Sequence, residues 1–146
     1  HHGCYKEGDV IRDQSSQGLQ IILSGTVDIM KQGECIEVLS ISDFMGMWRL
    51  CSGKSNLGEA VASSKITICL NISPEVCREL FASNTDSTTF WKLAAVEAIR
   101  YNCAGEFKFS RNDLIRLCLC GRVYTPSFGK AVQIQDPTLV LEGSVK

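Results

Sequence analysis

Histidine is absent from the 146-residue chain beyond its first two residues, which we interpret as the remnant of a purification tag. A Ser-His-Asp or Cys-His site would therefore lack its base. The carboxylates are scattered along the chain and form no acid–base pair with a recognisable spacing. We accordingly expect no catalytic residues and no enzymatic activity.

A positive charge excess and long hydrophobic runs are also lacking. The formal net charge is −1, whereas non-specific nucleic-acid binding needs a basic surface. The apolar stretch "WKLAAVEAIRY" is shorter than the roughly 20 residues of a membrane span and contains Lys92, Glu97 and Arg100. We expect neither a nucleic-acid partner nor direct insertion into a membrane.

Cysteine is present eight times, but no two cysteines have the C-x-x-C spacing of a zinc site. Cys118 and Cys120 are separated by one residue and have no second pair to complete a ligand set. Cys69, Cys77 and Cys118 lie in apolar periodic contexts, where cysteine acts as a small hydrophobic residue. We therefore predict reduced thiols, a cytosolic setting and no metal site.

The first 72 residues predict short strands. In "LQIILSGTVDIM", Leu19, Ile21 and Leu23 share one face, and Gly25 interrupts the run as a bend or bulge would. "KQGE" predicts a hairpin turn before "CIEVLSI", and "AVASSKITICLNI" ends the series with residues 66, 68 and 70 on one face. Strands at this spacing are typical of a barrel or sandwich.

The following segment predicts three helices. Ser73 is a suitable N-cap and Pro74 suits the first helical position, so a helix is expected from there to about Phe81. "FWKLAAVEAIRY" predicts a well-buried second helix. "SRND" is a capping pattern before "LIRLCLC", and Gly121 ends that third helix. Strands, helices and a return to period two in residues 122–146 together predict an α+β fold.

The C-terminal "PTLVLEGSVK" resembles "QIILSGTV" near the start of the chain. We expect residues 129–146 to begin a second β unit that continues beyond the end of this chain. A simple C-terminal hairpin with a chance likeness is the alternative, because an L-x-L-x-G-x-V pattern is common in strands.

The strand half resembles a cyclic nucleotide-binding domain over roughly residues 5–100. The similarity is carried, in order, by "YKEGDVI", "LQIILSGTVDIM", "SDFMGMWRL" and "AVASSKITICLNISPEVCREL". It implies a jelly-roll-like β-barrel followed by helices and a C-terminal β segment. The expected organisation is a tag remnant at residues 1–2, the nucleotide-binding-like domain with its helices at 3–103, and a helix plus the second β unit at 104–146.

In that family a short phosphate-binding cassette holds the ligand. The resemblance implies a glutamate that accepts from the ribose hydroxyl, an arginine that pairs with the cyclic phosphate, and backbone N–H groups at a helix start. Here Met47 stands at the glutamate position and Leu57 at the arginine position. The expected degenerate pocket consists of Phe44, Gly46, Met47, Leu57, Gly58 and Glu59.

The helical half and "VQIQDPTLVLEGSVK" are similar to the cytosolic tail of sodium/proton exchangers, both the sperm-type exchangers and the plant salt-tolerance antiporters. The preferred sperm type implies a regulatory domain on the cytoplasmic side of the plasma membrane, with the sperm flagellum as one location. Its expected partners are the transmembrane part of the same exchanger and the dimer mate. No cofactor is expected.

Two alternatives accompany this reading. In the first, the domain is a genuine sensor of cAMP or cGMP that uses Arg49 or Lys54 in place of the missing arginine. In the second, it is a transcription regulator of the catabolite-activator type. That class needs a basic recognition helix after "RNDLIRLCLC", where the sequence has Pro126 and a predicted strand.

Overall fold

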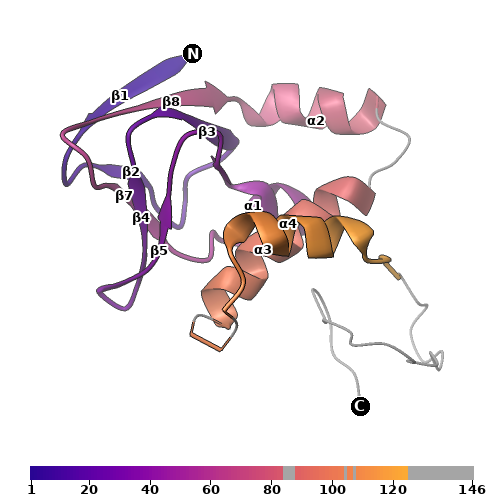
Figure 1. Ribbon diagram of the computed structural model, residues 1–146. Helices are drawn as coiled ribbons and strands as arrows, with labels where there is room; N and C mark the ends of the chain where they lie inside the picture. Colours follow the sequence, from indigo (N-terminus) through magenta and orange to yellow (C-terminus); the bar gives the residue numbers. More distant parts are fainter. Residues whose placement is uncertain (84–87, 104, 107, 125–146) are drawn as a thin grey trace.

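Two antiparallel four-stranded sheets face one another in the computed structural model, which describes residues 1–83, 88–103, 105–106 and 108–124 (Figure 1). In spatial order the first sheet contains β1 (His2–Lys6), β8 (Ile66–Ile72), β3 (Leu19–Ser24) and β6 (Phe44–Met45). The second contains β2 (Val10–Arg12), β7 (Glu59–Ala62), β4 (Val27–Lys31) and β5 (Glu34–Leu39). This two-sheet arrangement is that of a jelly roll rather than of one closed barrel.

Four helices accompany the sheets in the described residues: α1 (Met47–Ser52), α2 (Pro74–Ser83), α3 (Thr88–Asn102) and α4 (Arg111–Cys120). Helix α1 lies between β6 and β7, and α3 packs against both α1 and α4. Figure 1 shows α1, α3 and α4 gathered beside the sheets, whereas α2 extends outward from the end of β8. The predicted α+β class is confirmed.

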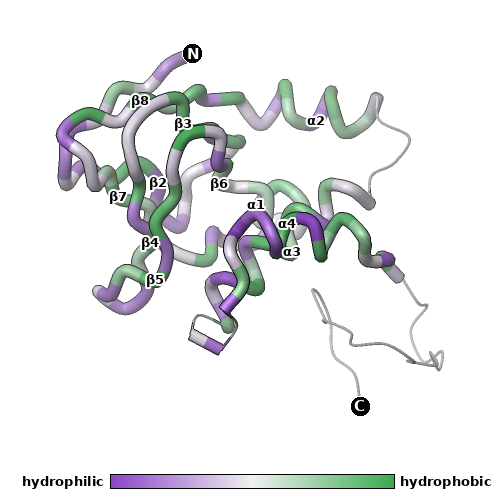
Figure 2. Tube along the Cα trace, viewed as in Figure 1, coloured by the Kyte–Doolittle hydropathy of each residue, from purple (hydrophilic) through white to green (hydrophobic). Residues whose placement is uncertain are grey.

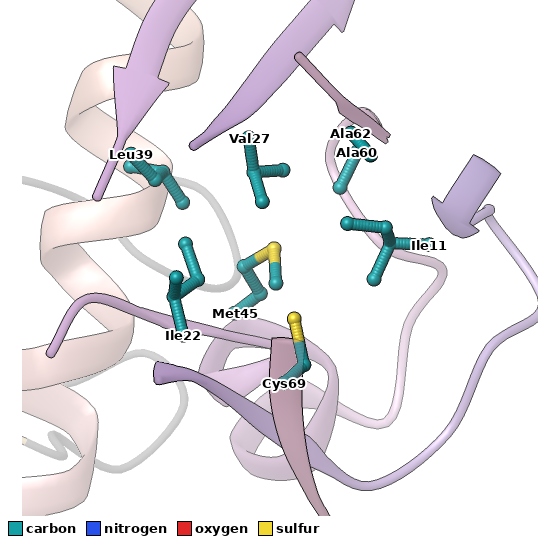
Figure 3. Packing of buried hydrophobic residues seen from close by; sticks show 8 residues of the cluster. All are labelled: Ile11, Ile22, Val27, Leu39, Met45, Ala60, Ala62 and Cys69. Carbon is teal, nitrogen blue, oxygen red and sulfur yellow. The ribbon is translucent and has the colours of Figure 1, made fainter. Parts of the chain in front are cut away.

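The core between the sheets is built from small and aliphatic side chains. They point toward one another in Figure 3: Ile11, Ile22, Val27, Leu39, Met45, Ala60, Ala62 and Cys69. The sequence predicted that residues 19, 21 and 23 of β3 and residues 66, 68 and 70 of β8 form the buried faces, but the opposite faces are buried in this core. On β3 the most buried residues are Gln20 and Ile22, and on β8 they are Thr67 and Cys69. Residues 19, 21 and 23 therefore face away from this core.

Local signals in the sequence predict the turns and caps correctly. Gln32 and Gly33 connect β4 to β5 with φ angles of 52° and 82°, as a two-residue hairpin of right-handed twist requires. Gly25 lies beside a register shift between β3 and β8. Ser110 caps α4, where its side chain accepts a hydrogen bond from the Asp113 amide at 3.1 Å.

The second hydrophobic cluster joins the helices to the sheets. Met47 and Trp48 of α1 pack on Ala94 and Ala98 of α3, and aromatic side chains including Phe44 surround them. Ala94 and Ala98 are one helical turn apart, and their small side chains let α1 approach α3 closely. This cluster holds α3 against the segment that contains the expected cassette.

Helix α2 is amphipathic and only partly covered. Hydrophilic and hydrophobic residues alternate along it (Figure 2), and Val76 and Leu80 are exposed while Cys77 is buried. Among the described residues, no helix is both long and apolar enough to cross a membrane. All eight cysteines are free in the structure. The predicted β unit at 129–146 lies outside the described residues.

Candidate functional site

The segment from β6 to β7 forms a sharp turn, the short helix α1 and a loop. Gly46, at the start of α1, has a φ of 101° that side-chain-bearing residues rarely adopt. A Cβ atom on Gly46 would lie 2.5 Å from Nη2 of Arg12 and 2.5 Å from the carbonyl oxygen of Gly18. Glycine is therefore required here both by the backbone conformation and by the close approach of β2 and the loop before β3.

A cavity of about 50 Å³ lies beside this segment. Its walls come from β2, β4, β5, β6, the loop at residues 56–58, β7, α3 and α4, so elements far apart in the sequence meet here. The charged lining residues are Arg12, Glu37, Glu97 and Arg111. Two of these side chains are guanidinium groups and two are carboxyl groups.

Glu97 of α3 binds the start of α1. Its two carboxylate oxygens accept hydrogen bonds from the amides of Met47 and Trp48, each at 3.0 Å. Burial of this side chain raises its pKa above the ordinary value, against the opposing effects of the two amides and of Arg111 and Arg12. One buried carboxyl group thus joins α3 to the segment from β6 to β7, which we call the cassette-like segment.

Arg12 of β2 is buried, with 3% of its surface exposed. Its guanidinium donates to neutral acceptors: the side-chain oxygen of Asn56 at 3.0 Å, the carbonyl of Ser16 at 3.0 Å and the side-chain oxygen of Gln20 at 3.4 Å. Burial lowers its pKa, and the nearby negative charge of Glu97 partly offsets that effect. Arg12 is therefore a buried cation whose pKa is supported most strongly, among nearby charges, by the carboxyl group of Glu97 on α3.

Arg111, the first residue of α4, reaches the opposite wall of the cavity. Its Nη1 donates to Glu37 of β5 at 3.1 Å, and its Nη2 donates to the carbonyl of Phe44 at 3.1 Å. Its Nε lies 3.2 Å from a carboxylate oxygen of Asp43 but is not aligned for a hydrogen bond. Glu37 also accepts from Arg100 of α3 at 3.0 Å. These contacts fasten α3 and α4 to the second sheet.

Only some of the pocket residues predicted from the sequence line the cavity. Phe44, Gly46, Leu57 and Gly58 line the cavity. Met47 is buried in the cluster under α3, and its side chain is not part of the cavity wall.

The charged residues expected near the ligand lie outside the cavity lining. Glu59 is exposed on β7. Arg49 donates to the carbonyl of Gln14 at 3.0 Å on the outer side of α1, and Lys54 is exposed in the following loop.

Sequence reasoning missed the four charged lining residues. Glu97 has the clearest signal, because it is the one carboxylate within the mostly apolar helical stretch "WKLAAVEAIRY". Arg12 directly follows the core residue Ile11 in a strand, and Arg111 is hidden inside a capping pattern that explains it locally. No local sequence pattern predicts that side chains of α3 and α4 line the cavity. In the described residues there is also no group of three or more metal-binding side chains.

No protein-family model matches the chain, and no curated protein matches it. Solved structures do resemble it. A regulatory subunit of a cAMP-independent protein kinase A from Trypanosoma cruzi, bound to guanosine, has a TM-score of 0.60 at 16% identity; the match covers 81% of this chain and 41% of that one.

Two further structures have the same fold. An EAL enzyme in its cAMP-bound form has a TM-score of 0.55 at 14% identity, with 68% of this chain and 28% of that chain covered. A protein kinase A regulatory domain bound to Sp-2Cl-cAMPS has a TM-score of 0.52 at 16% identity, with 67% and 70% covered. The match thus covers less than half of the Trypanosoma cruzi subunit and of the EAL enzyme. It has the fold of cyclic nucleotide-binding domains, as the sequence predicted.

Proposed function

We propose that the chain is a non-catalytic regulatory domain whose degenerate cyclic-nucleotide pocket does not bind cAMP or cGMP tightly. One observation carries the proposal: the cavity beside the cassette-like segment is about 50 Å³, whereas small-molecule pockets have about 300–1,000 Å³. Side chains of α3 and α4, among them Glu97, Tyr101 and Arg111, occupy the surrounding space.

The chemistry of the segment supports the same conclusion. Leu57 stands at the expected arginine position and lines the cavity with an apolar side chain. Loss of one charge-assisted phosphate contact costs about 1.5–3 kcal/mol. Met47, at the glutamate position, is buried against α3 and offers no acceptor for a ribose hydroxyl. A nucleotide would therefore have to displace the helices and would gain little in return.

Isothermal titration calorimetry with cAMP and cGMP tests this proposal. We expect no saturable heat at ligand concentrations up to 1 mM. A dissociation constant in the low micromolar range would contradict it and favour the alternative of a genuine nucleotide sensor. In that case Arg49→Ala and Lys54→Ala would show whether either side chain supplies the phosphate contact.

Guanosine provides a third titration, because the Trypanosoma cruzi subunit is bound to that nucleoside and a nucleoside carries no phosphate. The proposal predicts no binding here either, since the cavity is too small for the base and ribose. Saturable binding of guanosine would contradict a closed pocket even where cAMP and cGMP fail to bind.

We further propose that this domain regulates a sodium/proton exchanger from the cytoplasmic side of the plasma membrane, in contact with the transmembrane part and the dimer mate. The support is the sequence order of the helical half, from "TTFWKLAAVEAIR" to "VQIQDPTLVLEGSVK". The full-length protein containing this chain should be reconstituted in liposomes. An imposed sodium gradient should then drive protons across the membrane in the direction opposite to sodium. Deletion of residues 3–120 should change that rate. Absence of sodium-driven proton flux would contradict the proposal.

A further inference from the structure

The outer face of the first sheet, which points away from the core, is apolar. Its side chains on β3 and β8 are residues 19, 21 and 23 and residues 66, 68, 70 and 72, and every one is leucine or isoleucine. The cross-strand pairs Ile21–Leu70 and Leu19–Ile72 place these side chains side by side on one surface. A contiguous apolar surface of this kind marks an interaction site when it is exposed.

The helices cover only one end of this outer face. There, Leu19 packs against the hydrophobic cluster of Met47 and Trp48. At the other end, Leu23 is 38% exposed and Ile66 is 54% exposed. Figure 1 shows the described helices beside the sheets, with β1 and β8 on the far side from α3 and α4. The outer face therefore extends an apolar contact of the fold beyond the part that the described helices cover.

The charge of the outer face limits what can bind there. Strands β3 and β8 contain no Lys, Arg, Asp or Glu, and β1 contributes Lys6, which pairs with Ile66. Cys4 of β1 pairs with Ile68 on the same face and is exposed. A matching occupant presents aliphatic side chains, and an acidic group of that occupant complements Lys6.

A segment of the same chain meets these requirements in its sequence. Residues 131–142, "AVQIQDPTLVLE", lie outside the described residues and form two runs of period two, separated by Pro137. Asp136 and Glu142 are the charged residues of this segment, and both are acidic. One side of the two runs is aliphatic: Val132, Ile134, Leu139 and Leu141.

The length of the chain after α4 is sufficient for this segment to reach the outer face. Tyr124 is the last described residue, and residues 125–146 span up to about 70 Å when extended. A domain of this size has a radius of gyration of about 14 Å. A pair of short strands is marginally stable in water by itself, so the segment gains stability when its aliphatic side is covered.

From these observations we propose that the outer face of the first sheet is the docking surface of residues 131–142 of the same chain. The aliphatic side of the segment covers the exposed part of the face, including Leu23 and Ile66, and its acidic residues complement Lys6. A tethered segment has a millimolar effective concentration, which favours it over a second copy of the chain. This inference goes beyond the proposed function and does not depend on it, because tight cAMP binding would leave the outer face unchanged.

Site-specific photo-cross-linking provides the first test. The photoreactive amino acid p-benzoylphenylalanine replaces Leu23 in the full chain, and cross-linked peptides are identified by mass spectrometry. We expect cross-links to residues 131–142. An equal mixture of isotope-labelled and unlabelled protein shows whether each cross-link lies within one chain.

Val38 is the matched control position, because it is exposed on β5 of the second sheet. The same amino acid at that position should give at least fivefold less cross-linking to residues 131–142. Cross-links from position 23 to a second copy or to another segment, or a yield no higher than that of the control, overturn the proposal.

The reactivity of Cys4 provides the second test and leaves the sheet unaltered. In the full-length chain the docked segment should shield this thiol from alkylation by N-ethylmaleimide. Ile134→Asp places a charge on the aliphatic side of the segment and should raise the Cys4 alkylation rate at least fivefold. Gln133→Asp adds the same charge on the other side of the alternation and should leave the rate unchanged.

Other cysteines serve as internal references in this experiment. Cys35 is exposed on the second sheet and should react at the same rate in all three proteins, whereas the buried Cys69 should stay protected wherever the sheets remain folded. Equal Cys4 rates in the wild type and Ile134→Asp, or equal acceleration by Ile134→Asp and Gln133→Asp, overturn the proposed docking.

Discussion

The Glu97 carboxyl group connects helix α3 to the start of α1 beside the cavity. It is buried, it bonds two amides of α1, and it lies near Arg12, Arg111 and the thiol of Cys51. Burial, and next the negative charge of Glu97, raise the pKa of Cys51 to about 12, so that thiol stays neutral. The charged groups of the site are therefore the carboxyl groups of Glu37 and Glu97 and the guanidinium groups of Arg12 and Arg111.

Stability should depend on pH through Glu97. Its folded-state pKa is raised above the ordinary 4.5, so the folded protein holds this proton more tightly than the unfolded chain. The corresponding stability is fully present below about pH 4.5 and is lost as the pH rises through the raised pKa. Glu97→Gln is neutral at every pH. The free energy of unfolding of the wild type minus that of Glu97→Gln, measured by urea denaturation, should fall from pH 4.5 to 8. A constant or rising difference would refute this sign.

Gly46 should tolerate no side chain. Gly46→Ala places a Cβ atom 2.5 Å from Arg12 and from the Gly18 carbonyl at a φ of 101°, so we expect a loss of about 3 kcal/mol or more. Gly8→Ala is the control, because Gly8 also has a positive φ but has no atom within 4 Å of the added Cβ. That change should cost about 1–2 kcal/mol. Equal losses in urea denaturation would show that the contact with Arg12 is unimportant.

At the scale of elements, sequence patterns predicted what is local. The α4 cap at Ser110, the start of α2 at Pro74 and the turn at Gly33 depend on neighbours within a few residues, and all three were predicted. The buried faces of β3 and β8 were not. The faces that the second sheet covers include the polar residues Gln20 and Thr67, so the apolar periodicity favoured the opposite face of each strand.

The candidate site was predicted only where the resemblance supplied a template. Leu57 and Phe44 line the cavity because the cassette-like segment has the expected path between β6 and β7. Glu97 and Arg111 come from helices whose approach depends on tertiary packing against Met47 and Trp48. Periodicity and capping patterns in a single sequence do not predict contacts such as those of Met47 and Trp48 with Glu97, about 50 residues away.

Helix α4 should depend on Arg111 for its position. The Arg111 and Glu37 side chains are 9% and 7% exposed, and removal of one partner from a buried ion pair costs about 3–5 kcal/mol. We expect Arg111→Met to lower the free energy of unfolding by an amount near the lower end of this range, because Glu37 keeps its hydrogen bond to Arg100. Hydrogen exchange of α4 should accelerate at the same time.

Arg116→Met is the control for this experiment, because Arg116 is exposed on the same helix. It should change stability by no more than about 0.5 kcal/mol. If Arg111→Met behaved like Arg116→Met, the docking of α4 would have to depend on its apolar contacts, such as that of the buried Leu114.

At the scale of the whole molecule, strands of both sheets and the helices α3 and α4 line a cavity of about 50 Å³, below the usual 300–1,000 Å³ of small-molecule pockets. The fold is shared with structures that are bound to cAMP or to guanosine, and here α3 and α4 contribute charged side chains to the cavity. Similarity of fold and similarity of ligand are thus separate questions, and the site residues decide the second.

The melting temperature of the wild-type chain with and without 1 mM cAMP tests most directly the proposal that the pocket does not bind this nucleotide. A ligand at a hundredfold its dissociation constant would stabilise the fold by about 2.7 kcal/mol, which for a chain of this size is a rise of several degrees. We predict that the melting temperature changes by less than about 1 °C. For a chain of this size, such a change corresponds to stabilisation of the folded state by about 0.3 kcal/mol or less. A dose-dependent rise of several degrees would contradict the account.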